Sequence, residues 1–466
     1  SGLHQGLGVY SDAWLVKTDS VGNITWQKCR GGSYGDGFYD VRTTTDGGFI
    51  AAGFTYSNDS EVTGNHGVPG SQSDFWIVKL DSAGNIQWQK CFGGTNDDEA
   101  KVVQQTPDGG YIVAGNTFSN DGDAADNHGD YDFLVLRLDS TGSLIWHRCL
   151  GGAEEDKTDA VEQTAGGSFI VAGYTYSHDG NVTVNYGWSD MWLVKLSDIG
   201  NLLWQKSIGG NYDENAAAIH TTPDGGFIIA GKTASNDSVV TCGHGNWDVW
   251  VLKTDSNANI TWKKCFGGQR ADIAFDAQIA SDGGYILCGT TKSNDGDVSG
   301  NHDTTGFYTD AWILKLDSAG NFQWQQTLGG SLIDDAHSIL ETNDGGWLAG
   351  GFTNSADGDV SGNHGSFDFR LVKLSEITGV TENISSLNGI DIFPNPSDGI
   401  IHFSSQREGP VKCEVFNFLG EKISIAWLAA YGENELNLSF LCNGIYLLKI
   451  SDEKQTVVKL LAIQKK

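Results

Sequence analysis

Basic residues are scarce in this chain of 466 residues. Lys and Arg together number 29, against 59 Asp and Glu, so the formal net charge is −30 at pH 7. Residues 379–466 carry 8 basic and 10 acidic residues, so almost all of the excess negative charge belongs to the part that precedes them. A negative field of this size repels nucleic-acid phosphates and anionic lipids and attracts cations. We therefore expect no nucleic acid among the partners.

Long apolar runs and prolines are also lacking. No stretch approaches the roughly 20 apolar residues that a membrane helix needs, so we predict no transmembrane segment. The pattern of a signal peptide does not occur at Ser1. Six prolines against 63 glycines indicate tight turns rather than a disordered chain. The 15 tryptophans and a hydrophobic content of 39% are ample for a packed core.

Cysteine is infrequent too, with eight residues in the chain. Cys29, Cys91, Cys149 and Cys265 occupy the same position in four segments of similar sequence. Equivalent positions in separate repeats lie too far apart for a bond, so we expect small buried side chains rather than a disulfide framework. A bond between Cys413 and Cys442 is the alternative that stays open near the C-terminus.

A sequence unit recurs along the first 374 residues. Its Gly-Gly pairs stand 58 or 62 residues apart and begin at Gly31, Gly93, Gly151, Gly209, Gly267 and Gly329. Each unit holds four strand-like runs, a to d, as in Ala100–Gln105, Tyr111–Thr117, Asp74–Leu80 and Asn85–Cys91. The turn from a to b is Asp-Gly-Gly in five units, which indicates a hairpin. Four-stranded units of this period predict an all-β fold, a β-propeller, with a solenoid as the alternative.

The repeat resembles the kelch-like propellers. In that family a run ending in glycine follows strand a, and a tryptophan opens strand d. In this chain, the tryptophans near the start of the d runs are Trp26, Trp88, Trp146, Trp204, Trp262 and Trp324.

The number of strand-like runs is unequal. There are six a–b hairpins and six d runs but seven c runs, the first of which begins at Asp12. A histidine stands eight residues before the aspartate of the c run in two long b–c loops and at the N-terminus: His66 and Asp74, His302 and Asp310, His4 and Asp12. We therefore expect Ser1 to fall within a b–c loop, with a signal peptide, a d strand and one a–b pair before it. That d strand would pair with Asp368–Leu374, so residues 1–374 should form a seven-bladed ring whose first blade is incomplete and which has a gap.

The C-terminal part differs from the repeat. Residues 375–388 read as a polar linker, and residues 389–466 hold alternating strands typical of a small immunoglobulin-like β-sandwich. Two motifs stand out, Pro-Asn-Pro-Ser-x-Gly at Pro394–Gly399 and Asn-Gly-Ile-Tyr-Leu-Leu-Lys at Asn443–Lys449. With Phe418–Lys422 and Val457–Leu461, they resemble the type A C-terminal sorting domain of the type IX secretion system, a family found in Bacteroidota. A generic sugar-binding sandwich is the alternative.

This resemblance implies export and a surface location. The partners it implies are the secretion machinery, including an outer-membrane shuttle and a sortase, and the location it implies is extracellular or on the outer-membrane surface. Removal of the tail would fall within the linker. The residues that match the sorting signal are Pro394, Asn395, Pro396, Gly399, Asn443, Gly444, Tyr446 and Lys449.

The b–c loops contain repeated Asn and Asp residues. Antiparallel strands bring all b–c loops to one face, where binding residues are often found. Carboxylates separated by glycine suit calcium, which takes six to eight oxygen ligands. The predicted calcium ligands are Asp121, Asp123, Asp126, Asp295 and Asp297. The alternative is that these side chains cap turns through the backbone.

Histidines and aromatic residues also recur in these loops. Blade symmetry would spread the histidines around the axis, so we predict that they hold the loops by hydrogen bonds rather than bind a metal. The aromatic residues before strand c vary more between the units. Exposed rings beside Asn and Asp suit a sugar ligand, although sealing of the space between blades is the alternative. The predicted ligand-binding residues are Trp188, Trp247, Tyr131, Tyr308 and Phe367.

No catalytic motif is present in the sequence. There is no nucleophile elbow, His-Glu-x-x-His zinc motif or phosphate loop. Propellers do host enzymes, so this absence does not decide the matter. The function that we predict is a secreted or cell-surface module that binds glycan or protein. The alternatives are a polysaccharide-active hydrolase or lyase with a site in the central funnel, and a structural surface or matrix component.

Overall fold

The chain forms two compact units, Ser1–Ser375 and Glu376–Lys466. In the first unit, the computed structural model describes residues 11–303 and 305–375. In the second, it describes residues 392–393, 397, 400–406, 411–416, 422–428, 431–441, 444–451 and 456–463. Among all these residues, no helix is long and apolar enough to cross a membrane.

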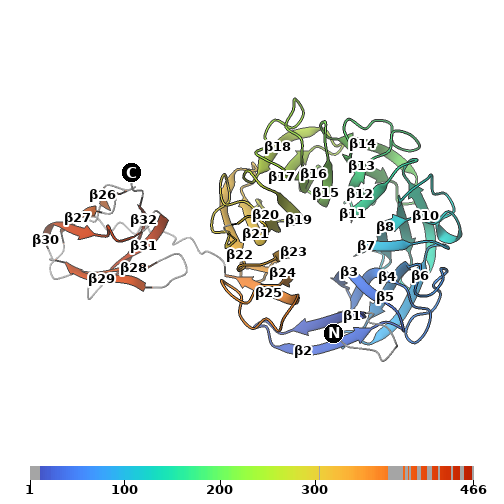
Figure 1. Ribbon diagram of the computed structural model, residues 1–466, viewed down its shortest axis with the longest axis horizontal. Helices are drawn as coiled ribbons and strands as arrows, with labels where there is room; N and C mark the ends of the chain where they lie inside the picture. The colour runs from blue at the N-terminus through green and yellow to red at the C-terminus, as the bar shows by residue number, and fades with distance from the viewer. Residues whose placement is uncertain are drawn as a thin grey trace. The chain divides into compact units, whose positions relative to one another are not determined.

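Seven antiparallel sheets surround a central axis in the first unit (Figure 1). Five of them have four strands, and Figure 1 shows the a strands nearest the centre and the d strands outermost. The a strands are β3 (Asp36–Thr43), β7 (Asp98–Gln105), β11 (Asp156–Gln163), β15 (Glu214–Thr221), β19 (Asp272–Ile279) and β23 (Asp334–Glu341). The b strands are β4 (Phe49–Thr55), β8 (Tyr111–Thr117), β12 (Phe169–Thr175), β16 (Phe227–Thr233), β20 (Tyr285–Thr291) and β24 (Trp347–Thr353).

The outer half of each blade is made of c and d strands. The c strands are β1 (Ala13–Thr18), β5 (Asp74–Leu80), β9 (Asp132–Leu138), β13 (Asp190–Leu196), β17 (Asp248–Thr254), β21 (Asp310–Leu316) and β25 (Asp368–Leu374). The d strands are β2 (Ile24–Arg30), β6 (Ile86–Phe92), β10 (Leu144–Leu150), β14 (Leu202–Ile208), β18 (Ile260–Phe266) and β22 (Phe322–Leu328). This arrangement confirms the predicted propeller of four-stranded blades.

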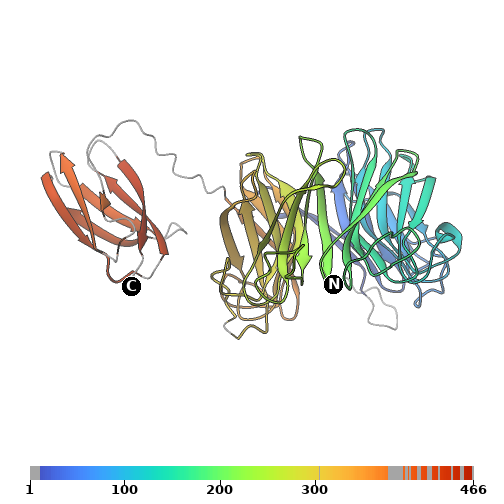
Figure 2. The ribbon, with the colours of Figure 1, turned by 90° about the horizontal axis from the view of Figure 1, so that it is seen from above.

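The two faces of the ring carry different connections. Because neighbouring strands run antiparallel, the b–c loops and d–a turns leave one face, which we call the loop face (Figure 2). The a–b and c–d turns leave the other, the turn face. The a–b turns are short: the N–H of Thr44 donates to Gly48 O at 3.0 Å, and the N–H of Gly47 donates to Thr44 O at 2.9 Å. Gly47 has φ of +80°, a conformation that glycine adopts without strain. One b–c loop contains a short 3₁₀ helix, η1 (Gly122–Ala124).

The hydrophobic cores of the propeller lie between the blades. Six clusters of buried side chains join the seven sheets in succession. Adjacent residues of a c strand face opposite neighbours, so Phe75 packs toward β8 and β9, whereas Trp76 packs toward β1. Both side chains are fully buried. Each blade is therefore stabilised by its neighbours rather than by a core of its own.

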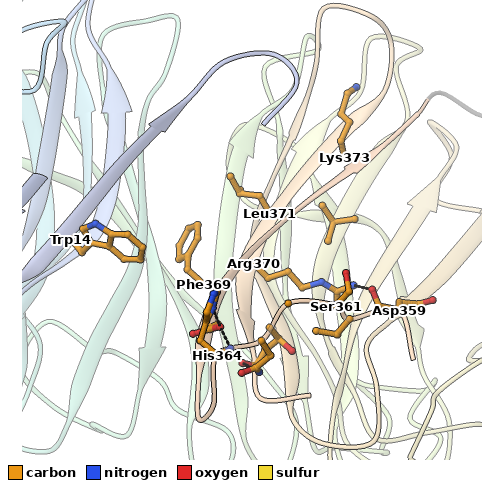
Figure 3. Close-up of a pocket in the computed structure, with 14 residues that line it drawn as sticks. Trp14, Asp359, Ser361, His364, Phe369, Arg370, Leu371 and Lys373 are labelled. Atoms are coloured by element: carbon orange, nitrogen blue, oxygen red, sulfur yellow. Dashed lines mark hydrogen bonds and ion pairs between the residues drawn. The ribbon is translucent and has the colours of Figure 1, made fainter. Parts of the chain in front are cut away.

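The first and last sheets are incomplete, as predicted. Within the described ranges, the first holds β1 and β2, and the last holds β23, β24 and β25. Trp14 of β1 and Phe369 of β25 point into the seam between them (Figure 3). Their exposed fractions are 45% and 64%, while the corresponding Trp76 and Phe75 are fully buried. A groove of about 490 Å³ runs along β25 at this seam.

One disulfide joins Cys242 in a b–c loop to Cys265 in β18. The prediction that Cys265 is a free, buried thiol was therefore wrong. Its partner lies in the same blade, whereas the prediction compared only the d strands of separate blades. In the first complete blade, the loop residue at the place of Cys242 is Gly64, and a Cβ there would lie 3.8 Å from Cys91 Cβ. The loop thus faces its own d strand. The free cysteines among the described residues are Cys29, Cys91, Cys149, Cys288 and Cys413.

The second unit is a β-sandwich, as predicted. One sheet has the order β26–β27–β30 and the other β29–β28–β31–β32. Buried Ile401, Val415, Leu436 and Ile450 from the two sheets share one core. The strands are β26 (Ile392–Phe393), β27 (Ile400–Gln406), β28 (Val411–Phe416), β29 (Lys422–Leu428), β30 (Tyr431–Asn437), β31 (Gly444–Ser451) and β32 (Thr456–Ile463). Cys442, the predicted alternative partner of Cys413, lies outside the described residues.

Candidate functional site at the loop face

An acidic residue at the start of each a strand joins neighbouring blades at the loop face. Asp156 Oδ2 accepts hydrogen bonds from the Gly152 N–H at 2.7 Å and the Ser177 hydroxyl at 2.8 Å. The N–H of Asp156 donates to Tyr131 O of the preceding blade at 2.6 Å. The N–H of Asp272 forms the same bond with the carbonyl of Trp247 at 2.7 Å. The residue before a c strand is thereby fixed at the junction of two blades, near the central channel.

Three of the predicted aromatic residues lie exposed along this rim. Trp188 is 65% exposed and contacts Tyr212, with ring centres 5.9 Å apart. Phe367 is 54% exposed and meets Phe352 at 5.2 Å between ring centres. Tyr308 is also exposed. These residues come from different blades, so they form separate surfaces around the rim.

Tyr131 and Trp247 are partly buried because each contacts a lysine of an inner strand. The Lys157 ammonium lies 4.2 Å from the centre of the Tyr131 ring and 2.7 Å from the Glu155 carboxylate. The Lys232 ammonium lies 3.7 Å from the centre of the Trp247 ring. Cations over aromatic faces at these distances are attracted by the ring electrons. Ring and ammonium group therefore present one combined surface to the channel mouth.

Lys232 is the most unusual charge at this mouth. Within the part of the chain that the structure describes, its ammonium makes no ion pair and contacts the Trp247 ring. Burial lowers the pKa of Lys232 below its ordinary value, although the charges of Asp213 and Asp159 act in the opposite direction. An ammonium group without a bound carboxylate is available to a polar ligand.

A second group of rings lies at the mouth between β19 and β23. Phe275 and His337 stack with ring centres 4.4 Å apart and planes 4° from parallel. His337 also meets Phe352, at 5.3 Å. Burial lowers the pKa of His337, which favours the neutral imidazole. These rings connect with Phe367 and continue the aromatic rim across two blades.

The arrangement suits a ligand with both apolar faces and hydroxyl groups. Exposed rings offer flat apolar contact area, and the carboxylates and ammonium groups beside them offer hydrogen bonds. Lys101 repeats this pairing on β7: its ammonium lies 2.6 Å from Glu99 and 3.6 Å from the centre of the Tyr39 ring. Sugars carry both kinds of surface. We therefore take the rim and the channel mouth together as the candidate site.

The sequence located the rim of this site but missed the wall of the channel. The missed residues are Tyr39, Glu99, Lys101, Glu155, Lys157 and Lys232. A signal for the a-strand residues among them was present in the repeat itself. The second and fourth residues of the a strand differ in all six units, while the first is Asp or Glu in every one. Variation at a fixed place in a repeat indicates positions that the fold does not dictate.

Four of the five aspartates predicted to bind calcium hold turns in the structure. Asp121 accepts hydrogen bonds from the Thr95 N–H at 2.8 Å and the Thr95 hydroxyl at 3.0 Å, and Asp295 accepts one from the Gln269 N–H at 2.9 Å. Asp123 and Asp297 each accept a longer bond from the first N–H of a Gly-Gly turn, and Asp126 is exposed. Among the described residues, no group of three or more His, Cys, Asp and Glu is placed to hold a metal ion. Calcium binding stays a prediction.

The loop histidines have the structural role that was predicted. His66 Nδ1 lies 2.6 Å from Asp74 Oδ2, and the same oxygen accepts the His66 N–H at 2.9 Å. Each histidine binds the c-strand aspartate of its own blade, so the rings do not converge. The other pairs are His128–Asp132, His244–Asp248, His302–Asp310 and His364–Asp368.

The predicted sorting residues fall only partly within the described residues. Gly444, Tyr446 and Lys449 belong to β31, which pairs with β28 and β32. The remaining ones, Pro394, Asn395, Pro396, Gly399 and Asn443, lie outside the described residues.

Known proteins resemble this chain at different levels. The regulatory protein FlaEY of Caulobacter vibrioides is 23% identical over 268 residues, which cover 53% of this chain and 26% of FlaEY. This chain thus spans about a quarter of that relative. The Pan2 WD40 domain of Neurospora crassa has 10% identity and a TM-score of 0.40, with 92% of this chain and 90% of that domain covered. A puromycin hydrolase has 12% identity and a TM-score of 0.42, covering 80% and 51% of the two chains. Resemblance this slight does not indicate a ligand.

The tail gives the most specific match. Residues 391–464 match the family described as the secretion system C-terminal sorting domain. A domain of this kind implies handling by the type IX secretion system, with export and anchoring through the tail. This chain therefore carries a sorting domain of that family, C-terminal in sequence to a β-propeller, and it is an extracellular or cell-surface protein.

Proposed function

We propose that the propeller is a carbohydrate-binding module presented outside the cell, with its ligand at the rim and channel mouth of the loop face. The single observation that carries this proposal is the placement of two rings at the rim: Trp188 lies exposed against Tyr212, and Trp247 has the Lys232 ammonium over its face. Calcium at the loop aspartates, kelch-like ancestry, a Bacteroidota source and cleavage of the tail belong to the same proposal.

A carbohydrate fits this surface better than a protein partner does. Protein interfaces need a broad, contiguous area of about 800 Å² on each side. The exposed rings here are instead separated into small groups on different blades, each with polar atoms close by. Sugar rings of an extended glycan would meet such groups one after another.

The test is a glycan array probed with the full-length protein, followed by titration of the best polysaccharide. Trp188→Ala and Trp247→Ala should each weaken binding by about tenfold or more, because one stacking ring contributes roughly 1.5 kcal/mol. Phe322→Ala is the matched control, since it removes an exposed ring from the outer strand β22.

Three outcomes would reject the proposal. The first is that the array shows no glycan ligand. The second is that Phe322→Ala weakens glycan binding as much as Trp188→Ala and Trp247→Ala do. The third is degradation of a bound polymer, measured as new reducing or unsaturated ends, which would replace a binding module with a hydrolase or lyase.

A further inference from the structure

A cavity lies at the opposite end of the central channel, near the turn face. Its volume is about 610 Å³, and inner strands of five blades line it. Charged side chains in the wall are Arg42 of β3, Glu162 of β11 and His220 of β15, and the amides are Gln104 of β7 and Gln278 of β19. Pockets for small ligands have volumes of roughly 300–1,000 Å³. The cavity is therefore large enough for a sugar-sized molecule.

The carboxylates near this cavity are already engaged by the protein. Glu162 Oε2 lies 2.8 Å from His220 Nδ1, and its Oε1 accepts the Thr221 N–H at 3.0 Å. Asp40 accepts the Arg42 Nε–H with both oxygens, at 2.9 and 3.1 Å. Asp40 Oδ2 also accepts a backbone N–H from the next blade at 3.0 Å. Both acids thus orient a basic group and have little capacity left for a ligand.

The two basic groups keep donors that the protein does not use. Both bonds to Asp40 come from Arg42 Nε, so the two terminal nitrogens of Arg42 make no hydrogen bond among the described residues. His220 uses Nδ1, and its Nε2 has no partner within the described ranges. Burial works to lower the pKa of His220, but the hydrogen bond and charge of Glu162 outweigh it and the net shift is upward. The raised pKa favours a charged ring with Nε2–H as a donor.

A third acid near these groups is also bound. Asp276 accepts the N–H of Ile339 at 2.9 Å and the N–H of Ala277 at 2.8 Å. Burial raises its pKa, which favours the neutral acid. Both of its oxygens thus accept backbone N–H groups rather than the donors of Arg42 or His220.

We propose that this turn-face cavity binds a small monoanionic ligand, an acidic sugar whose carboxylate is held by Arg42 and His220. The terminal nitrogens of a guanidinium form a fork that matches a carboxylate. A dianion such as phosphate fits less well, because the carboxyl groups of Asp40 and Glu162 lie beside it. Hydroxyl groups of the sugar would meet Gln104 and Gln278. This site lies on the other face from the rim and does not depend on the proposed carbohydrate site there.

The test is calorimetric titration of the full-length protein with D-glucuronate, D-glucose, acetate and inorganic phosphate. Glucuronate should bind most tightly. Arg42→Gln should weaken its binding at least tenfold, and Arg42→Lys, which keeps the charge but loses the fork, should weaken it by a smaller factor. Lys90→Gln is the control for loss of one positive charge, because Lys90 is exposed on the outer strand β6.

Each other outcome would overturn the inference. Absence of glucuronate binding would do so, as would equal affinity for acetate or phosphate, or an Arg42→Gln variant that is folded by circular dichroism and still binds fully. Trp188→Ala tests whether the glucuronate that is detected occupies the loop face instead. If that substitution abolishes glucuronate binding and Arg42→Gln does not, the turn-face site is wrong even though the protein binds sugars.

Discussion

At the scale of single residues, a lysine of the c strand binds the aspartate of the a–b turn in most blades. Lys79 Nζ lies 2.8 Å from Asp46, and Lys253 Nζ lies 2.8 Å from Asp224. The hydrogen bond from Lys79 is the largest influence that lowers the pKa of Asp46 below its usual range. In one blade Arg137 takes the place of the lysine and binds Asp108. In another, Gly166 occupies the aspartate position and leaves Lys195 without this pair.

Gly166→Asp should stabilise the propeller by about 0.5–1 kcal/mol. The new carboxylate would reach Lys195, and replacement of glycine lowers the entropy of the unfolded chain. Gly166 has room for a side chain, since the nearest atom to its Cβ would be Thr164 Oγ1 at 4.0 Å. Thermal unfolding measures the effect. Gly166→Ala is the control, because it lowers the entropy of the unfolded chain in the same way but adds no carboxylate for the ion pair. Equal melting temperatures for the two variants would contradict the ion pair.

Sequence reasoning at this scale succeeded for the loop histidines, which were predicted to hold the loops by hydrogen bonds. The pairing of His66 with Asp74 was predictable because a recurring loop motif stands at a fixed spacing from a recurring aspartate. The stacking of Phe275 on His337 joins two blades and depends on the ring closing to a particular radius. No local pattern encodes that radius, so the channel wall was not predicted.

At the scale of elements, the disulfide fixes a b–c loop to the outer edge of its blade. Cys242 and Cys265 are 23 residues apart, with Cα atoms 5.4 Å apart. A bond across a loop of this length restricts the unfolded chain. The b–c loop of the blade that contains β18 is therefore held covalently.

Cys242→Ser should lower the free energy of unfolding by about 3 kcal/mol, because the loop is no longer closed in the unfolded state. Differential scanning calorimetry without reductant would show this as a lower melting temperature. Dithiothreitol should destabilise the wild type and leave the variant nearly unchanged. Cys91→Ser is the control for a free thiol in the corresponding place of another blade. An equal response of both variants to reductant would refute the assignment.

The strands themselves were largely predictable, since hairpin turns and a fixed period define them. The predicted runs Ala100–Gln105 and Asn85–Cys91 correspond to the observed strands Asp98–Gln105 and Ile86–Phe92. The register shift between Ala100 and Val102 was not predictable. A bulge of this kind has no strong sequence signal without a glycine.

At the scale of the whole molecule, five of the six junctions between blades among the described residues bury two acidic side chains. Asp190 and Glu214 illustrate the arrangement: a Cβ on Gly209 would lie 2.2 Å from Asp190 Oδ1 and 2.6 Å from Glu214 Oε2. Asp190 Oδ1 is buried and has no hydrogen-bond partner among the described residues. Burial raises the pKa of Asp190 to about 6, and the charge of Glu214 adds to the effect. The groups whose pKa burial likewise raises to about 6 are Asp74, Asp98 and Asp156.

We expect the propeller to become more stable as the pH falls from about 7.5 to about 5. An unfolded Asp has a pKa near 3.9, and a raised pKa in the folded state means that folding favours the protonated acid. The stabilisation is complete below about pH 4 and is lost as the pH rises through about 6. Melting temperatures across this range measure it. A melting temperature that falls steadily from pH 7.5 to pH 5 would contradict the prediction.

Asp190→Asn tests the same idea at one junction. The amide stays neutral and can donate to Glu214. The free energy of unfolding of the variant should therefore depend less on pH, and at pH 8 it should exceed that of the wild type by up to about 3 kcal/mol. Asp317→Asn is the control, since Asp317 lies in an exposed c–d turn and its pKa is lowered by bonds from Asn321. Parallel pH profiles for Asp190→Asn and the wild type would show that this junction does not titrate in that window.

Among the described residues, six cores join the seven sheets in succession, and none of these cores joins β1 to β25. Removing an end sheet uncovers one core, whereas removing any other sheet uncovers two. Amide hydrogens of β1 and β25 should therefore exchange with solvent sooner than those of β13 or β17. On heating, the ring would fray from Trp14 and Phe369 toward the middle blades. The strands that follow Trp188 and Trp247 in the sequence, β13 and β17, would unfold last.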